Sequence, residues 1–258
     1  MIKALVNGNW ESFNEDELQP GTDSFCFESG LYETFRTKNY RPVLLKPHLD
    51  RLFNSAEEIN LRIIYPRSKI KKMISRVLNN FHTKDQRARI IVTQDKVIIY
   101  TSTLNLDEKI YEGVSTITVS KQRDNPYIKT TNYKNCLDAY KIAMMKNCFE
   151  AILLDPEGKV LEGSRSNVFW VIGNSLMTRK NNVLPGVTRQ TIIEKSPYPI
   201  TYSQLTMFDF KGLDELFLTN SGSGIIPVLE VNSTTIGKGN PGPITLELLK
   251  LYDVWSNK

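Results

Sequence analysis

The sequence predicts a mixed α/β fold with two lobes, a smaller N-terminal α/β lobe and a larger C-terminal lobe. Strand-like runs and amphipathic helical stripes occur along the whole chain. The polar stretch Ser102–Glu112 separates a predicted hairpin from a new strand. A length of 258 residues allows either one large domain or two modest ones, since domains usually have ~100–200 residues. We therefore expect a small domain at 1–105, a linker at 102–112 and a larger domain at 113–258.

The N-terminal lobe is expected to be a sheet with helices on one face. Strands are predicted at Leu31–Thr37, Arg87–Val92 and Lys96–Thr101, the last two forming a hairpin. Apolar residues at i, i+3 and i+4 spacing predict a helix at Pro47–Leu61 and another after Pro66, with Ser68 as its N-cap.

The C-terminal lobe is richer in short strands. They are expected at Val114–Ser120, Ala151–Leu154, Val160–Leu161, Val168–Ile172, Leu216–Thr219 and Ile225–Leu229. Helices are expected at Asn135–Asn147, Thr188–Lys195 and Ile244–Trp255, the last beginning after Pro243. On this first helix and just after it, Cys136, Met144, Met145 and Cys148 are expected to be core residues.

Composition excludes several classes of protein. The net charge of +5 comes from scattered Lys and Arg, so no nucleic-acid partner is expected. The three cysteines, an odd number, indicate a reducing, cytoplasmic location. Only two histidines occur, and neither has metal-ligand spacing, so no metal site is expected. No run of ~18 apolar residues and no signal peptide is present, which predicts no membrane association.

Several sequence runs carry the functional information. They are Gly30–Arg36 (GLYETFR), Pro47–Leu52 (PHLDRL), Ile128–Tyr133 (IKTTNY), Leu161–Phe169 (LEGSRSNVF), Leu184–Arg189 (LPGVTR) and Glu215–Pro227. Together, in this order, they resemble the class IV aminotransferase family, the fold-type IV enzymes that depend on pyridoxal 5'-phosphate (PLP). The resemblance implies a fold with PLP in the cleft between the two lobes, a homodimer and a small-molecule amino substrate.

The resemblance implies a catalytic role for Lys129, which would form an imine with the aldehyde of PLP. Without the surrounding motifs, a surface lysine would be the better interpretation. Glu162 matches the glutamate that keeps the pyridine nitrogen protonated. Its alternative is a solvent-exposed glutamate at the end of a strand.

Other site residues follow from the same motifs. The backbone N–H groups of Val187 and Thr188 are expected at a helix N-terminus, which suits a phosphate, although an ordinary helix cap would look the same. Arg51 and Ser221 match further phosphate ligands of the family, and Tyr133 matches a residue near the phenolic oxygen of the cofactor. Tyr32 and Arg89 match positions on the substrate side. His48 is expected to be structural.

The resemblance leaves the reaction open. The Glu33–Arg36 run (ETFR) looks most like 4-amino-4-deoxychorismate lyase of folate biosynthesis, which releases pyruvate and 4-aminobenzoate, and this is the leading interpretation. The alternative is an amino-acid transaminase that uses 2-oxoglutarate. Here the branched-chain type is favoured over the D-amino-acid type because no Arg-x-His follows the strand of Arg89. A binding protein that has lost PLP is the non-enzymatic alternative, and the retained lysine, glutamate and phosphate loops argue against it.

Overall fold

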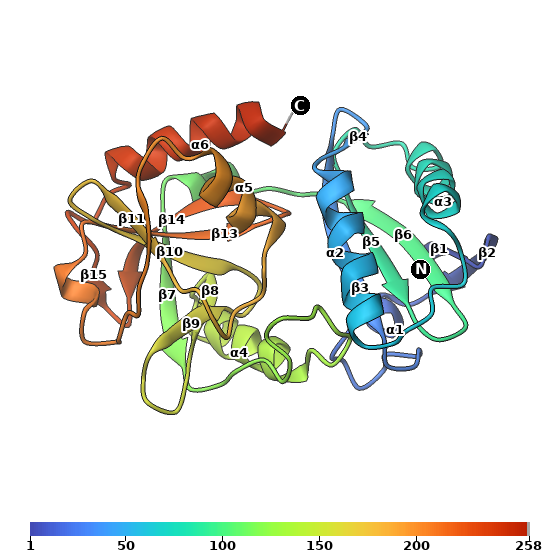
Figure 1. Ribbon diagram of the computed structural model, residues 1–258, viewed down its shortest axis with the longest axis horizontal. Coiled ribbons are helices and arrows are strands. Elements are labelled where there is room, and N and C mark those ends of the chain that lie inside the picture. Colours follow the sequence, from blue (N-terminus) through green and yellow to red (C-terminus); the bar gives the residue numbers. More distant parts are fainter. Residues whose placement is uncertain (257–258) are drawn as a thin grey trace. The chain divides into compact units, whose positions relative to one another are not determined.

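The computed structural model describes residues 1–256, and the chain divides into two compact units (Figure 1). The first unit comprises Met1–Asn105 and Ile128–Lys134, and the second comprises Leu106–Tyr127 and the chain from Asn135 onward. This division differs from the expected domains in the segment Ile128–Lys134, which joins the first unit. The reason is backbone pairing, because Thr130 forms a bridge with Leu31 and the Ile128 side chain enters the first core.

The first unit contains a six-stranded antiparallel sheet with strand order β2-β1-β6-β5-β3-β4. Its strands are β1 (Ile2–Val6), β2 (Asn9–Phe13), β3 (Leu31–Lys38), β4 (Arg41–Pro42), β5 (Gln86–Val92) and β6 (Val97–Thr103). The register pairs Val92 with Val97, which confirms the predicted hairpin.

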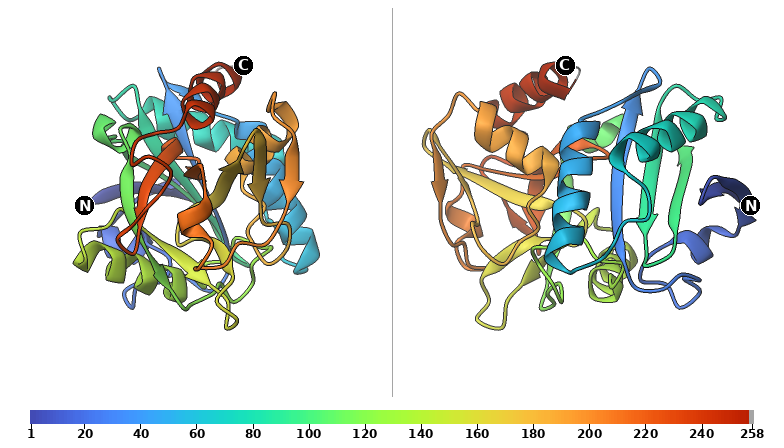
Figure 2. Two further views of the ribbon diagram at one scale, coloured as in Figure 1. Left: turned by 90° about the vertical axis from the view of Figure 1, so that its left-hand side faces the viewer. Right: turned by 45° about the vertical axis from the view of Figure 1, so that its right-hand side comes forward.

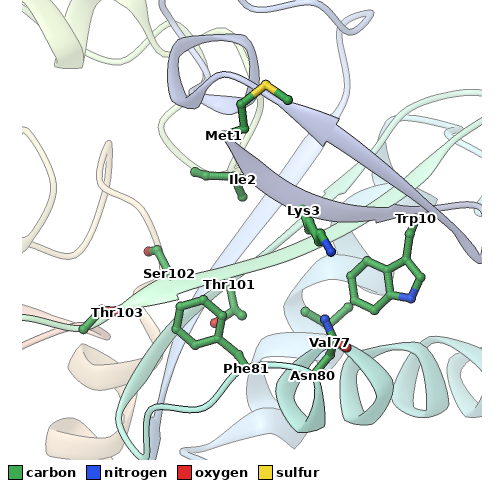
Figure 3. Close-up of a pocket in the computed structure, with 10 residues that line it drawn as sticks. All are labelled: Met1, Ile2, Lys3, Trp10, Val77, Asn80, Phe81, Thr101, Ser102 and Thr103. Carbon is green, nitrogen blue, oxygen red and sulfur yellow. The ribbon is translucent and has the colours of Figure 1, made fainter.

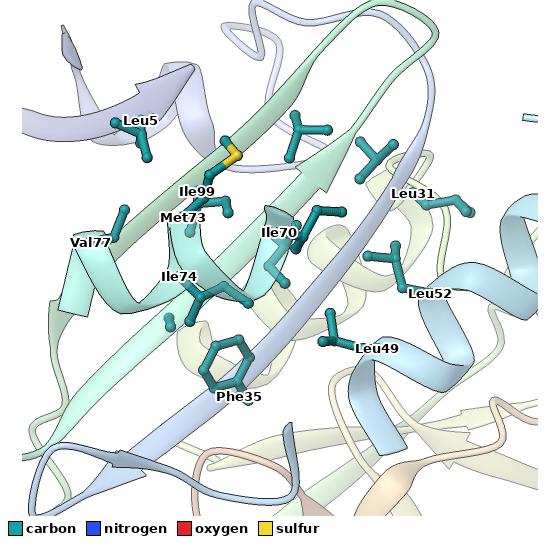
Figure 4. Packing of buried hydrophobic residues seen from close by; sticks show 14 of the residues in the cluster. Leu5, Leu31, Phe35, Leu49, Leu52, Ile70, Met73, Ile74, Val77 and Ile99 are labelled. Carbon is teal, nitrogen blue, oxygen red and sulfur yellow. The ribbon is translucent and has the colours of Figure 1, made fainter. Parts of the chain in front are cut away.

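Helices α2 (Leu45–Glu58) and α3 (Arg67–Asn79) pack against one face of this sheet (Figures 1 and 4). Their buried stripes meet every second residue of the strands, as the pleat of a sheet requires. The resulting core includes Leu5, Leu31, Phe35, Leu49, Leu52, Ile70, Ile74, Ile90 and Ile99. The prediction of Ser68 as N-cap is wrong: Pro66 has the extended conformation of a cap, and its carbonyl accepts from Lys69 N and Ile70 N. A four-residue helix, α1 (Glu15–Leu18), follows β2.

The second unit contains a mixed sheet with strand order β12-β11-β10-β13-β14-β7-β8-β9, and β15 pairs with β14. Its strands are β7 (Val114–Val119), β8 (Glu150–Leu154), β9 (Val160–Gly163), β10 (Asn167–Ile172), β11 (Ser175–Thr178), β12 (Ile200–Tyr202), β13 (Glu215–Asn220), β14 (Gly224–Val231) and β15 (Thr234–Thr235). The predicted strands of this lobe are all present. Side chains of Ile152, Val168, Trp170, Leu218 and Ile226 contribute to its core.

The other elements of this part of the chain are helices α4 (Lys134–Met145), α5 (Val187–Lys195) and α6 (Pro243–Ser256), and 3₁₀ turns at Glu108–Tyr111 and Phe210–Gly212. Helices α5 and α6 contact each other and strand β13 (Figure 2). Cys136 is buried on α4 as expected, whereas Cys148 lies after the helix and is only partly buried, and Met144 and Met145 are 50% and 75% exposed. The core prediction for the two methionines is wrong because the buried stripe of α4 consists of Cys136, Ala139 and Ala143, and the methionines lie outside this stripe. Within residues 1–256, no helix has the length and apolar character needed to cross a membrane.

Candidate active site

Lys129 is held in the first unit by backbone pairing with the start of β3. Its carbonyl accepts a hydrogen bond from Tyr32 N (3.0 Å), and Thr131 N donates to Gly30 O (2.8 Å). Gly30 itself lies close to the end of β5, where a Cβ would be 2.0 Å from the carbonyl oxygen of Val92. The half-buried side chain of Lys129 places Nζ 4.2 Å from the centre of the Tyr32 ring. Strand β3 therefore fixes both the backbone and the amine of Lys129.

Two further predicted residues, Tyr133 and Arg89, join Lys129 around the Tyr32 ring. Tyr133 contacts it edge to face, with ring centres 5.9 Å apart. The guanidinium carbon of Arg89 lies 5.7 Å from its centre. Arg89 donates to Gln19 Oε1 (2.8 Å), Tyr100 OH (3.0 Å) and Thr34 Oγ1 (3.3 Å). Because Tyr32, Thr34 and Arg89 alternate with core residues along their strands, they share the sheet face that α2 and α3 do not cover.

Arg51 belongs to a buried cluster on the opposite face of β3. Its Nε and Nη2 donate to Glu33 Oε1 and Oε2, both at 2.7 Å. His48 Nδ1 lies 2.8 Å from Glu33 Oε2 and donates, since an ionised carboxylate only accepts. Burial would raise the pKa of Glu33, but the charge and hydrogen bonds of Arg51, with a smaller contribution from His48, lower it to about 2. Burial lowers the pKa of His48, so its ring is neutral at neutral pH.

Glu162 lies at the end of β9 in the second unit and is 2% exposed. Its Oε1 accepts from Arg123 Nε (3.1 Å), and its Oε2 accepts from Leu184 N (3.1 Å) and Asn167 Nδ2 (3.3 Å). Asn167 also donates to the carbonyl of Leu184 (2.9 Å). The carboxylate is therefore oriented by a buried arginine, an amide side chain and the segment that precedes α5.

The first turn of α5 presents backbone donors. Gly186 is the N-cap, and no side chain caps this turn. Helix N-termini carry partial positive charge, so the amides of Val187 and Thr188 can bind an anion. Thr188 is 2% exposed, and its Oγ1 lies 3.1 Å from Tyr252 OH.

Ser221 lies in the turn that joins β13 to β14. Asn220 Oδ1 shapes this turn by accepting from Gly222 N (2.9 Å) and Ser223 N (2.7 Å). The neighbouring Thr219 hydroxyl is buried and finds no hydrogen-bond partner in the described chain. The turn thus combines the half-buried hydroxyl of Ser221 with a buried hydroxyl that has a proton left to donate.

Replacing Gly186 with alanine is expected to lower the free energy of unfolding by about 1–3 kcal/mol. The added Cβ would lie 2.1 Å from Asn167 Oδ1, and Asn167 cannot move without losing its bonds to Glu162 and Leu184. Urea denaturation checks this change. Gly212→Ala is the control, because its Cβ meets nothing within 4 Å. Equal stabilities for the two variants would contradict the expectation.

The model of the family described as amino-transferase class IV matches residues 30–231, most of the chain. This chain belongs to the class IV aminotransferase family. The D-alanine aminotransferase of Bacillus licheniformis is 28% identical over 95% of this chain and 93% of its own length. The branched-chain-amino-acid aminotransferase of Pseudomonas aeruginosa is 29% identical, over 83% of this chain and 78% of its own.

Solved structures share the fold-type IV architecture. The branched-chain aminotransferase of the archaeon Thermoproteus uzoniensis, determined with norvaline, superposes with a TM-score of 0.82 at 26% identity, over 98% of this chain and 93% of that one. A branched-chain amino acid aminotransferase determined with pyridoxamine 5'-phosphate, from the organism abbreviated T.th., superposes with a TM-score of 0.81 at 25% identity, over 97% of this chain and 92% of that one. The predicted α/β fold is thereby confirmed, as are the family and the dependence on PLP.

The residues of this class IV aminotransferase fit PLP chemically. The uncapped amides of α5 and the hydroxyl of Thr219 are donors that suit a phosphate. The Glu162 carboxylate keeps lone pairs beyond its three hydrogen bonds and can accept one more donor. Lys129 supplies a primary amine, and the Arg51 guanidinium is a planar donor of the kind that binds phosphate oxygens.

Sequence reasoning missed four residues that surround the predicted ones: Glu33, Arg123, Asn167 and Tyr252. Glu33 carries a detectable signal, because it alternates with Leu31 and Phe35 on the apolar face of a predicted strand. A carboxylate on such a face needs a buried cation. Arg123 and Tyr252 carry no comparable signal, since their partners lie 39 and 64 residues away.

A pocket of about 400 Å³ lies elsewhere in the first unit, near the N-terminus (Figure 3). Lys3, Trp10, Phe81 and Thr103 are among its lining residues. None of the predicted site residues lines it, so it has no part in the candidate active site.

Proposed function

We propose that this PLP-dependent enzyme is a transaminase that transfers the amino group of an L-amino acid, of the branched-chain type, to 2-oxoglutarate. The placement of Lys129 carries the proposal. Its backbone is paired with β3 and its amine lies over the Tyr32 ring, beside the Arg89 cluster. The names of the relatives favour a transaminase over the lyase that the ETFR run suggests.

Lys129 is the proton carrier in this proposal. Bound PLP supplies the aldehyde that takes up the amino group and the ring that accepts electrons from the substrate. Lys129 Nζ would take the proton from the substrate Cα and pass it to the cofactor within the same half of the transfer, and in the second half it would carry a proton back to Cα of the new amino acid. The paired backbone on either side of Lys129 limits the positions that Nζ can reach.

Glu162 is proposed to bind the pyridine nitrogen. An ionised carboxylate favours a protonated ring nitrogen, which is the form that withdraws electrons. Arg123, Asn167 and the amide of Leu184 hold the carboxylate in one orientation. The Glu162 carboxylate therefore needs little reorganisation during the reaction, because its three donors are already in place.

The phosphate is proposed to bind the amides of Val187 and Thr188, the hydroxyls of Thr188 and Ser221, and Arg51. Glu33 fixes the guanidinium of Arg51 by a bidentate ion pair, and His48 in turn donates to Glu33 Oε2. Tyr133 is proposed to hydrogen-bond the phenolic oxygen of the cofactor. These donors match the negative charge and the oxygen atoms of the cofactor.

Arg89 and Tyr32 are proposed to contact the substrate. Arg89 is a half-buried cation whose side-chain acceptors within the described chain are neutral: an amide, a phenol and a hydroxyl. A substrate carboxylate would supply the missing negative charge. The hairpin after β5 turns within Thr93–Lys96 and contains no histidine, so the D-amino-acid type is less favoured.

Assays with three substrates test this proposal. We expect purified enzyme loaded with PLP to form glutamate from L-leucine and 2-oxoglutarate faster than from D-alanine and 2-oxoglutarate. We expect no 4-aminobenzoate from aminodeoxychorismate in the absence of a keto acid. Faster reaction of D-alanine would change the assigned stereochemistry, and release of 4-aminobenzoate alone would refute the transaminase.

The lyase is the second candidate, and one contact favours it. Thr34, the threonine of the ETFR run, accepts a hydrogen bond from Arg89 Nε. The feature that resembles the lyase therefore lies at the residue proposed to bind the substrate carboxylate. The aminodeoxychorismate assay decides between the two reactions.

The oligomeric state and the compartment stay predictions. We propose a cytoplasmic homodimer, in line with the family resemblance. Sedimentation velocity is expected to give one species of twice the mass of the chain, and a monomer under assay conditions would contradict this.

A further inference from the structure

Tyr252, near the end of α6, contacts both segments that are proposed to bind the phosphate. Its side chain is almost fully buried, and its hydroxyl lies 3.1 Å from Thr188 Oγ1 in the first turn of α5. Its ring packs on Gly224, where a Cβ would lie 3.0 Å from Tyr252 Cε1. Gly224 has a φ of +78° and ends the turn that contains Ser221. One side chain therefore connects the α5 turn with the β13–β14 turn.

Helix α6 is anchored in a way that fixes Tyr252. At its N-terminus, the amides of Ile244 and Thr245 donate to the carboxylate of Glu215 at 3.0 and 2.7 Å. Glu215 begins β13, the strand that leads into the turn of Ser221. Further along the helix, Leu248 and Tyr252 are buried. Strand β13 thus anchors the start of α6, and the buried face of the helix holds Tyr252 in place.

The direction of the Tyr252–Thr188 hydrogen bond depends on the anion. Either hydroxyl can donate in this pair. A phosphate dianion has only acceptor oxygens, so the Thr188 proton must point to the phosphate when it is bound. Tyr252 must then be the donor to Thr188 Oγ1. Such a chain of hydrogen bonds polarises each member and strengthens the bond to the charged oxygen.

We propose that Tyr252 is a positioning residue for the cofactor phosphate, which it serves by donating to Thr188 and by packing under the turn of Ser221. The inference rests on the proposed phosphate roles of Thr188 and Ser221. It assigns to the last helix of the chain a part in holding the cofactor. Loss of the phenolic hydroxyl alone should weaken binding of PLP roughly 5- to 10-fold, the effect of one hydrogen bond.

The test measures binding of PLP to the cofactor-depleted full chain by absorbance titration. Tyr252→Phe keeps the ring against Gly224 and removes only the hydroxyl. Pyridoxal, which lacks the phosphate, is titrated in parallel. Tyr198→Phe is the matched control, because the Tyr198 hydroxyl bonds to Glu247 on the exposed side of the same helix.

We expect Tyr252→Phe to weaken PLP and leave pyridoxal unchanged, with a shifted ³¹P resonance of the bound phosphate, and Tyr198→Phe to change neither ligand. Thr188→Val should weaken binding of PLP by itself. The variant that combines Thr188→Val with Tyr252→Phe should bind PLP as well as the single variant with the lower affinity. Unchanged PLP binding in Tyr252→Phe, or equal losses for PLP and pyridoxal, would overturn the inference. If Thr188→Val and Ser221→Ala also had no effect, the proposed phosphate site would fail instead.

Discussion

Replacing Lys129 with alanine is expected to lower the rate of amino transfer by at least ~100-fold, because general acid–base catalysis contributes about 10²–10⁴. The variant should still fold, since the Lys129 backbone carbonyl makes the bond to Tyr32 N. The rate of glutamate formation from the amino donor and 2-oxoglutarate measures the effect. Binding of PLP is followed by its visible absorbance after dialysis.

A nearby lysine provides the control for this prediction. Lys134 is 60% exposed and pairs with Asp23, which is 94% exposed, so Lys134→Ala should retain the rate within a factor of about 2. If Lys129→Ala kept the normal rate and absorbance, the assignment of the reactive lysine would be incorrect.

Replacing Glu33 with glutamine is expected to lower the free energy of unfolding by about 3–5 kcal/mol, because the change leaves the Arg51 guanidinium largely buried without its anion. Binding of PLP should weaken as well, since Arg51 loses the bidentate contact that orients it. Asp50→Asn is the control. Asp50 is 34% exposed and pairs with Lys46 and Arg67, so its loss should cost ~1 kcal/mol or less.

The contribution of Glu33 to the free energy of unfolding is expected to fall as the pH falls. The pKa of Glu33 is about 2 in the folded chain, against 4.5 as its ordinary value. Its contribution, on the order of 3 kcal/mol, is present above pH 4.5 and is lost as the pH falls towards 2. Urea denaturation between pH 6 and pH 3 should therefore show a smaller loss in Glu33→Gln than in the parent protein. Parallel losses would show that folding does not lower the pKa of Glu33.

Sequence patterns predicted those parts of the fold in which buried residues recur at the regular spacing of a helix or a strand. Two strands with a short polar connection predicted the β5–β6 hairpin, and the spacing of Leu49, Leu52 and Ala56 predicted α2. Strand β2 was not predicted, because in the run NWESF only Trp10 and Phe13 are partly buried. An edge strand lacks the alternation that a half-covered strand shows.

The candidate site was predictable where a residue belongs to a motif and not where it depends on distant partners. Lys129 and Glu162 were identified by the runs around them, whereas their roles remain proposals. The neighbours that orient Glu162 come from separate parts of the chain, Arg123 before Lys129 and Leu184 before α5. Contacts of this kind depend on tertiary packing, which a single sequence does not display.

The pairing of Ile128–Lys134 with β3 has a consequence for how the protein is made. The ribosome synthesises the chain from its N-terminus, and domains generally fold as they emerge. The first unit is incomplete until residue 134 is available, because the edge of β3 beside Leu31 and the core position of Ile128 stay open. An open strand edge invites pairing with other chains. Synthesis of the first 105 residues therefore leaves a vulnerable intermediate, and the segment that carries Lys129 is also the one that closes it.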